Sequence, residues 1–434
     1  MNQYKVIVKL ILIALAIVIE KAHALEAHTL NNNALKLKAG YAQIDISPKI
    51  GATIQVMTGE QKPIKNIIDP LLAKAIYLND GKTQAVLISL DLIALTAIRQ
   101  EDLTAKVKAL AGINNLILSV THTHSGILPV SDQNTLAPRL AELIKAAEQN
   151  QQAVNIQVAS SQYEQAYNRI LNDNGTGKTL WTNQNRIATE KADLTLGVIN
   201  LTALNGKPYI TLVNYNAHPV ITMNRQAALV SADYPARLAH HIKQNYGSHT
   251  FFMLGAAGDI NPFDAGISDM GVKPLKVALN SADELGKAIA NKVLAMVNNS
   301  ATIQKPTTID FNSRNIELEF SSIKHSIKHL LKEGLNTSKL THQINTLTIG
   351  DNIALAFFGG EFFSDFKVQL AQKSPSKHTF FVGYSNGNIG YVPTKQALLL
   401  GGYGANKEQL IFAPETGQTL VNEALNLLGS DTKD

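Results

Sequence analysis

The stretch Leu116-Ile-Leu-Ser-Val-Thr-His-Thr-His-Ser-Gly126 joins a short apolar run to two histidines. A run of this length that ends in Ser-Gly is typical of a buried strand that stops at a loop. Alternate residues of a strand point the same way, so we expect His122 and His124 to project together at the strand's end. Such a pair can hold a metal ion and a substrate at one place, whereas a lone strand histidine is usually structural.

Apolar strand patterns and helical patterns alternate on both sides of this stretch, which predicts an α/β protein. No linker rich in Pro, Gly or Ser interrupts the alternation and no fixed-period repeat occurs, so we expect one large catalytic domain over residues 38–434. The expected strands are 85–90, 116–120, 209–215, 250–254, 346–358 and 379–382, and the expected helices are 103–110, 138–147, 235–245, 362–370 and 419–428.

The composition is that of a compact globular chain. Of 434 residues, 45% are hydrophobic and 17% are charged, which excludes a disordered or collagen-like protein. The sequence has no cysteine, so a disulfide scaffold, a thiolate metal site and a cysteine nucleophile are all excluded. Any metal ligand must therefore come from His, Asp, Glu or Tyr.

The N-terminus has the pattern of a secretory signal peptide over residues 1–24, followed by a leader segment over 25–37. Lys5 and Lys9 precede an apolar run that leads to Ala22-His23-Ala24, a typical cleavage site. The run is shorter than the ~20 residues that span a bilayer. We therefore expect an exported protein, periplasmic or secreted, cleaved near Ala24. The alternative is an uncleaved membrane anchor.

The formal charge argues against nucleic acid as a partner. Residues 1–24 carry three lysines and one glutamate, so their removal lowers the net charge from +5 to +3. No run of Lys and Arg of the kind that binds phosphate backbones occurs in the chain.

A third histidine follows a second apolar run. Residues 209–215 lead into Asn216-Ala-His218-Pro219, where the proline fixes the backbone beyond the histidine. Alone, His218 is as readily a packed residue as a metal ligand. Zinc hydrolases commonly use three protein ligands and leave one position open, so the strand-end histidines together predict a metal site.

A carboxylate ligand is also expected, and four acidic residues lie at loop ends. Glu361 is the best candidate because it follows Gly359-Gly360, where the missing side chains let a bulky group approach the backbone. The alternative is that Glu361 lies at the start of a helix, where the helix dipole favours a negative charge. The other candidates are Asp91, Asp233 and Asp259.

The segment Leu254–Phe263 is a further turn from strand to loop. Asp259 and Asn261 within it are available for hydrogen bonds to ligand side chains or to substrate. Asp259 is alternatively an ordinary turn cap.

A rival motif is Gly383-Tyr-Ser385-Asn-Gly387, which matches the nucleophile elbow of serine hydrolases. An elbow needs a helix directly after it and a histidine later in the chain. Residues 388–393 include glycine and proline, and the last histidine is His378. A serine hydrolase acting through Ser385 is therefore disfavoured.

Three of these motifs together resemble the neutral ceramidase family: THTHSG at 121–126, NAHP at 216–219 and GAAGDINP at 255–262. The resemblance runs in order from about 38 to 430. Further matching stretches are Gly40–Pro48, Asp69–Leu71, Asn168–Arg169, Ser231–Pro235, Gly360–Phe362 and Gly390–Thr394.

The resemblance implies layered mixed β-sheets flanked by helices, without the additional C-terminal Ig-like domain of larger members. It implies a zinc-dependent amide hydrolase in which a metal-activated water attacks an N-acylated lipid, and such a substrate implies peripheral membrane contact. The implied zinc ligands are His122, His218, Glu361 and Tyr391, with Tyr384 as the alternative tyrosine. The implied substrate-contacting residues are His124, Arg169 and Tyr403, with Asp259 and Asn261 beside them.

Two positions depart from the family pattern. Asn261 stands where members that cleave ceramide carry a serine, and Ile68 stands where a histidine precedes the Asp-Pro-Leu element. Hydrolysis by activated water needs no serine nucleophile, so an amide hydrolase remains the prediction. A non-catalytic lipid or glycan binder on the same scaffold is the alternative.

Overall fold

The computed structural model of the chain describes residues 37–55, 60–129, 132, 134–223, 228–268, 271–272, 274–303, 308–321 and 339–430. The predicted signal peptide lies outside these residues, as does the leader up to residue 36, so export stays a prediction. Within the described residues, no helix is both long and apolar enough to cross a membrane.

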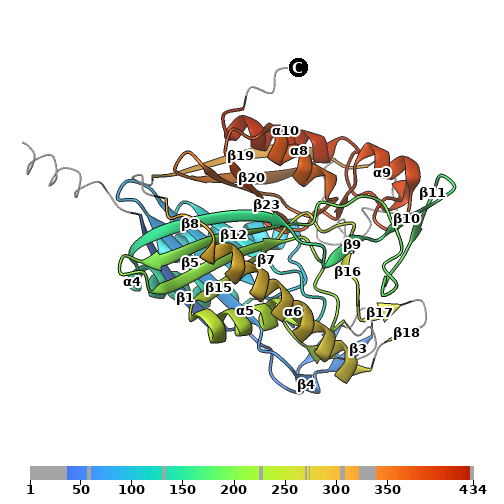
Figure 1. Cartoon of the computed structure of the whole chain (residues 1–434), viewed down its shortest axis with the longest axis horizontal. Coiled ribbons are helices and arrows are strands. Elements are labelled where there is room, and N and C mark those ends of the chain that lie inside the picture. Colours follow the sequence, from blue (N-terminus) through green and yellow to red (C-terminus); the bar gives the residue numbers. More distant parts are fainter. Residues whose placement is uncertain are drawn as a thin grey trace, which may run out of the picture.

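A mixed eight-stranded sheet forms the first large layer (Figure 1). The strand order is β15-β13-β12-β8-β1-β5-β6-β7, with parallel pairs β6/β7 and β13/β15. All five residues of β7 are buried, which explains the uninterrupted apolar run in the sequence. The strands are β1 (Lys38–Asp45), β5 (Leu72–Asn79), β6 (Gln84–Leu90), β7 (Leu116–Val120), β8 (Gln152–Gln162), β12 (Thr195–Ala203), β13 (Pro208–Tyr215) and β15 (His249–Leu254).

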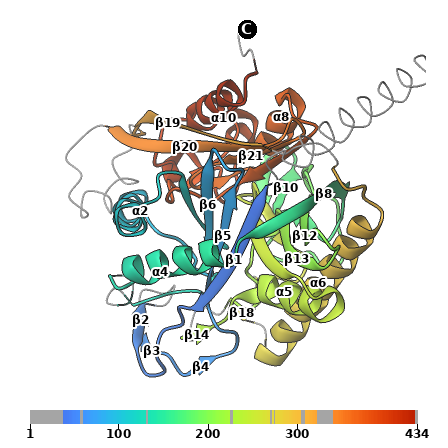
Figure 2. The same ribbon diagram turned by 90° about the vertical axis from the view of Figure 1, so that its left-hand side faces the viewer.

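Strand pairing joins the two halves of this sheet through one short junction, although the Ser89 hydroxyl of β6 also donates to the Phe252 carbonyl of β15 at 3.2 Å. Strand β1 pairs with β8 through Lys38↔Ala153 and Ala39↔Gln152, whereas β1 pairs with β5 along its whole length. Beyond that short junction the halves separate, as the view in Figure 2 shows for β1 and β8.

A four-stranded sheet packs face to face on the larger one. Its order is β19-β20-β21-β23, and β21 runs parallel to β23. Leu87 and Phe251 of the large sheet share one buried apolar cluster with Leu355 and Phe380 of the small sheet. The four strands are β19 (Ile309–Glu319), β20 (Lys339–Ile349), β21 (Ile353–Phe357) and β23 (His378–Val382).

Helices cover the outer faces of both sheets. In α4, Leu136, Leu140, Leu143 and Ile144 follow helical spacing and lie in the core between the helices and the large sheet. The helices on that side are α2 (Ala97–Ala111), α4 (Leu136–Gln149), α5 (Asp233–Tyr246) and α6 (Leu275–Asn298), and those on the small sheet include α8 (Asp365–Lys373) and α10 (Thr416–Leu427). The prediction of layered mixed sheets flanked by helices is confirmed.

Short elements complete the described chain. They are β2 (Thr53–Gln55), β3 (Gln61–Pro63), β4 (Asn66–Ile67), β9 (Ala166–Asn168), β10 (Ile170–Asp173), β11 (Thr176–Thr179), β14 (Leu229–Val230), β16 (Ile260–Pro262), β17 (Ile267–Ser268), β18 (Gly271–Val272), β22 (Glu361–Phe362), β24 (Tyr391–Val392), α9 (Lys395–Leu400) and the 3-10 helix η1 (Lys407–Gln409). Two predicted elements differ from the structure. Residues 346–358 belong to two paired strands that turn at Gly350 (φ 57°), and the helix expected over 362–370 begins at Asp365, after β22.

The carboxyl ends of the parallel strands meet at one place. The Val120 amide at the end of β7 donates to the Tyr384 carbonyl at 3.1 Å, and the Gly383 amide beyond β23 donates to the Leu254 carbonyl of β15 at 2.9 Å. Ligands of open α/β sheets bind outside the carboxyl ends of strands. The loops that follow β7, β13, β15 and β21 therefore form the region in which to look for a site.

A buried histidine that packs on Gly359, in the loop after β21, gives the first prediction. His342 in β20 is 2% exposed, its Nε2 has no partner in the described part of the chain, and burial lowers its pKa to about 4. An unfolded histidine titrates near ~6.5, so between these values the unfolded chain binds a proton that the folded protein excludes. The free energy of unfolding should therefore fall as pH falls through this window, by roughly 3 kcal/mol.

Urea unfolding at about pH 7.5 and about pH 4.5 measures this loss. We expect His342→Leu to lose less stability than the wild type between the two pH values, because the variant has no imidazole to protonate. An equal loss in both proteins would contradict the assignment to His342.

Candidate metal centre

His122 lies just beyond β7 in a left-handed backbone conformation. Its φ is 60°, and the strand ends two residues earlier at Val120. The sequence-based expectation that strand alternation aligns His122 with His124 is therefore wrong, although the side chains do converge. The His122 Nδ1–H donates to the carbonyl of Ile93, so this tautomer leaves the lone pair of Nε2 available. The side chain is buried.

His218, beyond the end of β13, is held in the same way. Its Nδ1–H donates to the Ala257 carbonyl at 2.6 Å, and its buried Nε2 has no hydrogen-bond partner among the described residues. A histidine whose one ring nitrogen is fixed by a backbone carbonyl, while the other faces a shared point, has the arrangement of a metal ligand.

Glu361 brings a carboxylate to the same point. Its Oε2 lies 3.4 Å from His218 Nε2 and 3.7 Å from His122 Nε2, and it has no hydrogen-bond partner in the described structure. Burial raises the pKa of the Glu361 carboxyl, but the nearby imidazoles of His122 and His218 lower this pKa by more. The result is a pKa of about 2. Burial lowers the pKa of His122 to about 4, against the attraction of Glu361. Near neutral pH Glu361 is therefore a carboxylate and His122 a neutral imidazole.

These separations fit one bound ion. Two ligand atoms that each lie about 2.0–2.1 Å from a tetrahedral zinc ion are about 3.3 Å apart. His124 Nε2 lies 3.1 Å from His122 Nε2, and ligand atoms of His122, His124 and His218 all lie within 4.8 Å of one another. The three histidines and Glu361 thus form a buried donor set suited to a metal, and the geometry does not separate His124 from the ligands.

Both candidate tyrosines lie beside this set. The Tyr384 ring is tilted against His122 with centroids 4.1 Å apart, and its buried hydroxyl has no partner in the described part of the chain. Tyr391 in β24 pairs with Glu361 of β22 in a parallel bridge. Burial and the Glu361 carboxylate raise the pKa of both phenols. Which tyrosine completes the set stays a prediction.

Arg169 forms the cationic side of the adjoining pocket. Its guanidinium donates to the Gly258 carbonyl and lies 4.9 Å from the ring centroid of Tyr403, 5.4 Å from Tyr391 and 5.8 Å from Trp181. The side chain is buried, and its Nε has no partner in the described residues. A fixed cation with an unused donor is suited to stabilising negative charge that develops on a substrate.

The pocket beside the histidines has a volume of about 40 Å³. One wall is a small apolar cluster of Val220, Met223 and Ala265, separate from the main core. The pocket is lined by His124, Arg169, Trp181, His218, Val220, Met223, Asn261, Ala265, Tyr391 and Tyr403. It therefore offers an apolar surface and hydrogen-bond donors at the same place.

Asp259 and Asn261 differ in what they face. The Asp259 carboxylate accepts from Asn168 Nδ2 at 2.7 Å and from the Ser364 amide at 2.8 Å, and burial raises its pKa to about 7. It therefore connects the end of β9, directly before Arg169, to the segment after Glu361. Asn261 donates to the Trp181 carbonyl at 3.2 Å, and its buried Oδ1 has no partner in the part of the chain that is described.

The serine motif does not form a nucleophile elbow. Ser385 is fully buried, and its hydroxyl donates to the backbone carbonyls of Val382 and Gly383 at 3.4 and 3.2 Å. The chain continues into strand β24 rather than into a helix. This geometry argues against nucleophilic catalysis by Ser385.

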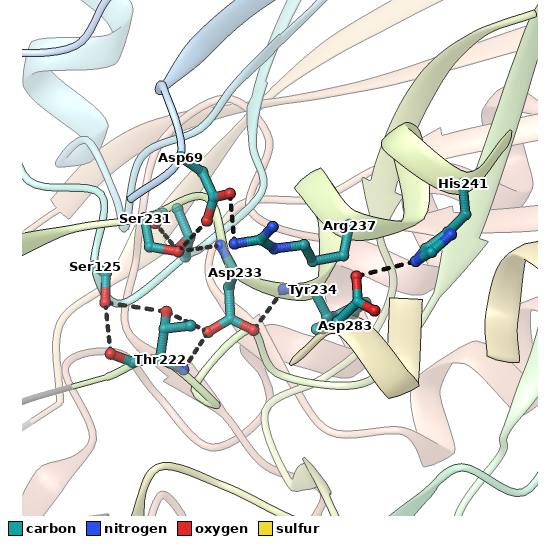
Figure 3. Close-up of polar contacts among 10 residues, drawn as sticks. Asp69, Ser125, Thr222, Ser231, Asp233, Tyr234, Arg237, His241 and Asp283 are labelled. Carbon is teal, nitrogen blue, oxygen red and sulfur yellow. Dashed lines mark hydrogen bonds and ion pairs between the residues drawn. The ribbon is translucent and has the colours of Figure 1, made fainter. Parts of the chain in front are cut away.

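A buried polar network fixes the loop that carries the histidines (Figure 3). The Asp233 carboxylate accepts from the amide and the hydroxyl of Thr222, each at 2.7 Å, and the Thr222 carbonyl accepts from Ser125 at 3.1 Å. Thr123 donates to the Ser231 carbonyl at 2.8 Å. Asp233, one of the four carboxylates considered from sequence, thus holds the start of α5 against the THTHSG loop instead of reaching the metal centre.

Comparison with known proteins tests the fold. No protein-family model matches the chain, and no curated protein is significantly similar to it. Two solved structures superpose well: one described as "Ceramidase complexed with C2" and the neutral ceramidase of Pseudomonas aeruginosa. Each has a TM-score of 0.71, is 15% identical in sequence and covers 91% of this chain. The match spans 75% of the first structure's chain and 74% of the second's. The fold is that of neutral ceramidase.

The resemblance inferred from the sequence motifs is therefore confirmed for the fold. In this structure His122, His218 and Glu361 lie together, and Arg169, Tyr391 and Tyr403 line one pocket. Sequence reasoning missed the walls formed by Trp181, Val220 and Met223. The signals available were the single tryptophan of the chain and the apolar residues directly after the His-Pro pair.

Close backbone packing at Gly258 gives a second prediction. A Cβ at this position would lie 2.3 Å from the carbonyl oxygen of Glu361 and 2.9 Å from that of Phe362, both backbone atoms. Gly258→Ala should displace Glu361, weaken metal binding by about tenfold or more and destabilise the fold by ~1–3 kcal/mol. Metal titration and urea unfolding measure the two effects.

Gly286→Ala is the matched control. A Cβ there would lie 2.6 Å from Arg237 Cβ and 2.7 Å from the Leu238 amide nitrogen, at the packing of α6 against α5. We expect similar destabilisation with unchanged metal affinity. If both variants bind metal as the wild type does, the Gly258 contact does not position Glu361.

Proposed function

We propose that the protein is a zinc-dependent hydrolase that cleaves the amide bond of an N-acylated lipid, of the ceramide type. The observation that carries the proposal is the convergence of three imidazoles and the Glu361 carboxylate at one buried point, with His122 and His218 each anchored through Nδ1. The fold supports the same reaction, because its solved neighbours are described as ceramidases.

The donor set fits zinc. His122, His218 and Glu361 would hold the ion, with Tyr391 as the proposed fourth ligand and Tyr384 as its alternative. Imidazole nitrogens with a carboxylate oxygen are a common zinc environment. When bound, zinc lowers the pKa of water toward ~7 and polarises a carbonyl group.

The other residues would stabilise the negative charge on the amide oxygen and transfer a proton to the leaving nitrogen. Arg169 and Tyr403 would donate hydrogen bonds to the amide oxygen as it becomes negative. His124 would orient the amide and pass a proton to the departing nitrogen. The C–N bond breaks, water supplies the new C–O bond, and the products are a carboxylate and an amine.

The apolar wall and Asn261 would set the choice of substrate. Val220 and Met223 offer a surface for alkyl carbons of a lipid, which would reach the protein by peripheral contact with a membrane after export. Asn261 Oδ1, buried without a partner in the described structure, is an acceptor for a substrate N–H or hydroxyl group.

The alternative is a lipid or glycan binder that keeps the fold without catalysis. Asn261 and Ile68 favour it, because both stand at positions where ceramide-cleaving members carry other residues. A binder predicts that replacement of His122 leaves ligand affinity intact, whereas the hydrolase predicts loss of turnover.

Elemental analysis of the purified chain, together with a panel of fluorogenic N-acyl amides and the matching esters, tests the proposal. We expect about one zinc per chain, and hydrolysis of the lipid amides that stops with chelator and returns with zinc. Hydrolysis that survives complete metal removal, or labelling of Ser385 by a fluorophosphonate probe, would contradict it.

A further inference from the structure

A polar cavity distinct from the histidine centre lies where the halves of the large sheet separate. Its volume is about 370 Å³, against about 40 Å³ for the pocket beside Arg169. Strands β1 and β5 line one side, β15 the other, and α5 closes it. The residues that line it from these elements include Tyr41, Lys74, Arg237, His240, Lys243, His249 and Thr250.

The cavity has a buried charged floor and an open mouth. Lys74 and Asp91 at the floor are 3% and 2% exposed, whereas His240 and Lys243 of α5 are exposed to solvent. The Lys74 ammonium lies 3.8 Å from Asp91 Oδ2, which is too far for a hydrogen bond. A buried ammonium normally uses its three donors, because burying an unpaired charge costs several kcal/mol.

The carboxylates of the cavity are already engaged. Asp69 accepts from Arg237 at 2.9 Å and from the Ser231 hydroxyl at 2.6 Å, and Figure 3 shows Arg237 reaching from α5 to this carboxylate. Asp91 accepts from the Leu72 amide at 3.0 Å. Neither acidic group is therefore set up to receive a cationic ligand.

Donors, in contrast, are in excess. Among the described residues, the Thr250 hydroxyl and the Arg237 Nε are buried without a hydrogen-bond partner. The Lys74 ammonium forms an ion pair with Asp91 at 3.8 Å, a separation that is longer than a hydrogen bond. The exposed Lys243 adds positive charge at the mouth. A cavity with unused donors and occupied acceptors matches a ligand rich in acceptors.

We propose that this cavity binds a small oxyanion, a phosphate or carboxylate group, with Lys74 at its base. The site is separate from the hydrolase centre and does not depend on the function proposed for that centre.

Titration calorimetry of the full chain with inorganic phosphate and, separately, with acetate tests the proposal. The protein is first dialysed against EDTA, because an oxyanion also binds a metal held by histidines. We expect saturable binding of at least one anion with one site per chain. Lys74→Met should weaken it by about tenfold or more, because a charge-assisted hydrogen bond is lost.

Two further variants locate the site. Ala239→Leu, on the α5 wall, keeps every charged group and fills the cavity, so it should also abolish binding. Lys207→Met removes an equal charge from an exposed turn outside the cavity and should leave binding unchanged. If Lys74→Met fails to fold, the Ala239→Leu variant decides.

Comparing the two anions shows which chemical group the cavity accepts. Binding of phosphate alone assigns a phosphate group, binding of acetate alone assigns a carboxylate, and binding of both assigns an oxyanion site without that discrimination. The absence of saturable binding by the wild type would overturn the proposal, and so would binding that Ala239→Leu leaves intact.

Discussion

Replacing His122 by alanine is expected to remove the bound metal and to lower amide hydrolysis by at least ~10³-fold, since a catalytic metal supplies several kcal/mol of transition-state stabilisation. The expectation follows from the position of the ring. Its Nδ1 is committed to the Ile93 carbonyl, its Nε2 lies 3.7 Å from Glu361 Oε2, and the side chain is buried.

Metal content by mass spectrometry and turnover of the best lipid amide are measured on the same preparations. His378→Ala is the matched control, because His378 opens β23 and is not part of the histidine group. We expect it to retain metal and activity. Loss of activity in His122→Ala with full metal content would place His122 outside the ligand set, and full activity in both variants would exclude a catalytic metal at this point.

Much of the fold was predictable because the strands that hold the centre are buried on both faces. The run at 116–120 matches β7, and those at 209–215 and 250–254 match β13 and β15 to within one residue. Strands β8 and β12 were not predicted. Only two residues of β8 are buried, and Gln, Asn and Ser are interspersed with its apolar residues, which weakens the hydrophobic signal.

The site was predictable in its residues but not in its geometry. Three histidines in two motifs at strand ends indicated a metal centre, because strand ends converge in α/β sheets. The left-handed φ of His122 cannot be seen in a sequence, since histidine adopts this conformation only where the surrounding contacts impose it. The position of Asp259, bound to Asn168 and the Ser364 amide, depends on contacts between residues far apart in the chain.

Arg169→Gln is expected to lower the turnover number by about 10²–10³-fold, equivalent to ~3–4 kcal/mol of barrier, with metal content and KM nearly unchanged. The guanidinium is buried among Tyr391, Tyr403 and Trp181, and its Nε is the donor without a partner among the described residues. Those rings exclude water, so a negative oxygen in the pocket gains more from a fixed cation than it would in solvent. Arg169→Lys should restore little, because an ammonium does not reproduce the planar donor pattern.

Arg186→Gln separates catalysis from a general effect of losing an arginine beside an aromatic ring. Arg186 lies 4.0 Å from the centroid of Phe263, is exposed, and does not line the pocket. Its replacement should leave the turnover number unchanged. If Arg169→Gln instead lost metal in proportion to activity, the role of Arg169 would be structural: its hydrogen bond to the Gly258 carbonyl would help to position Glu361, because Gly258 packs on the Glu361 backbone. Unchanged metal with a reduced turnover number assigns Arg169 to the developing oxyanion.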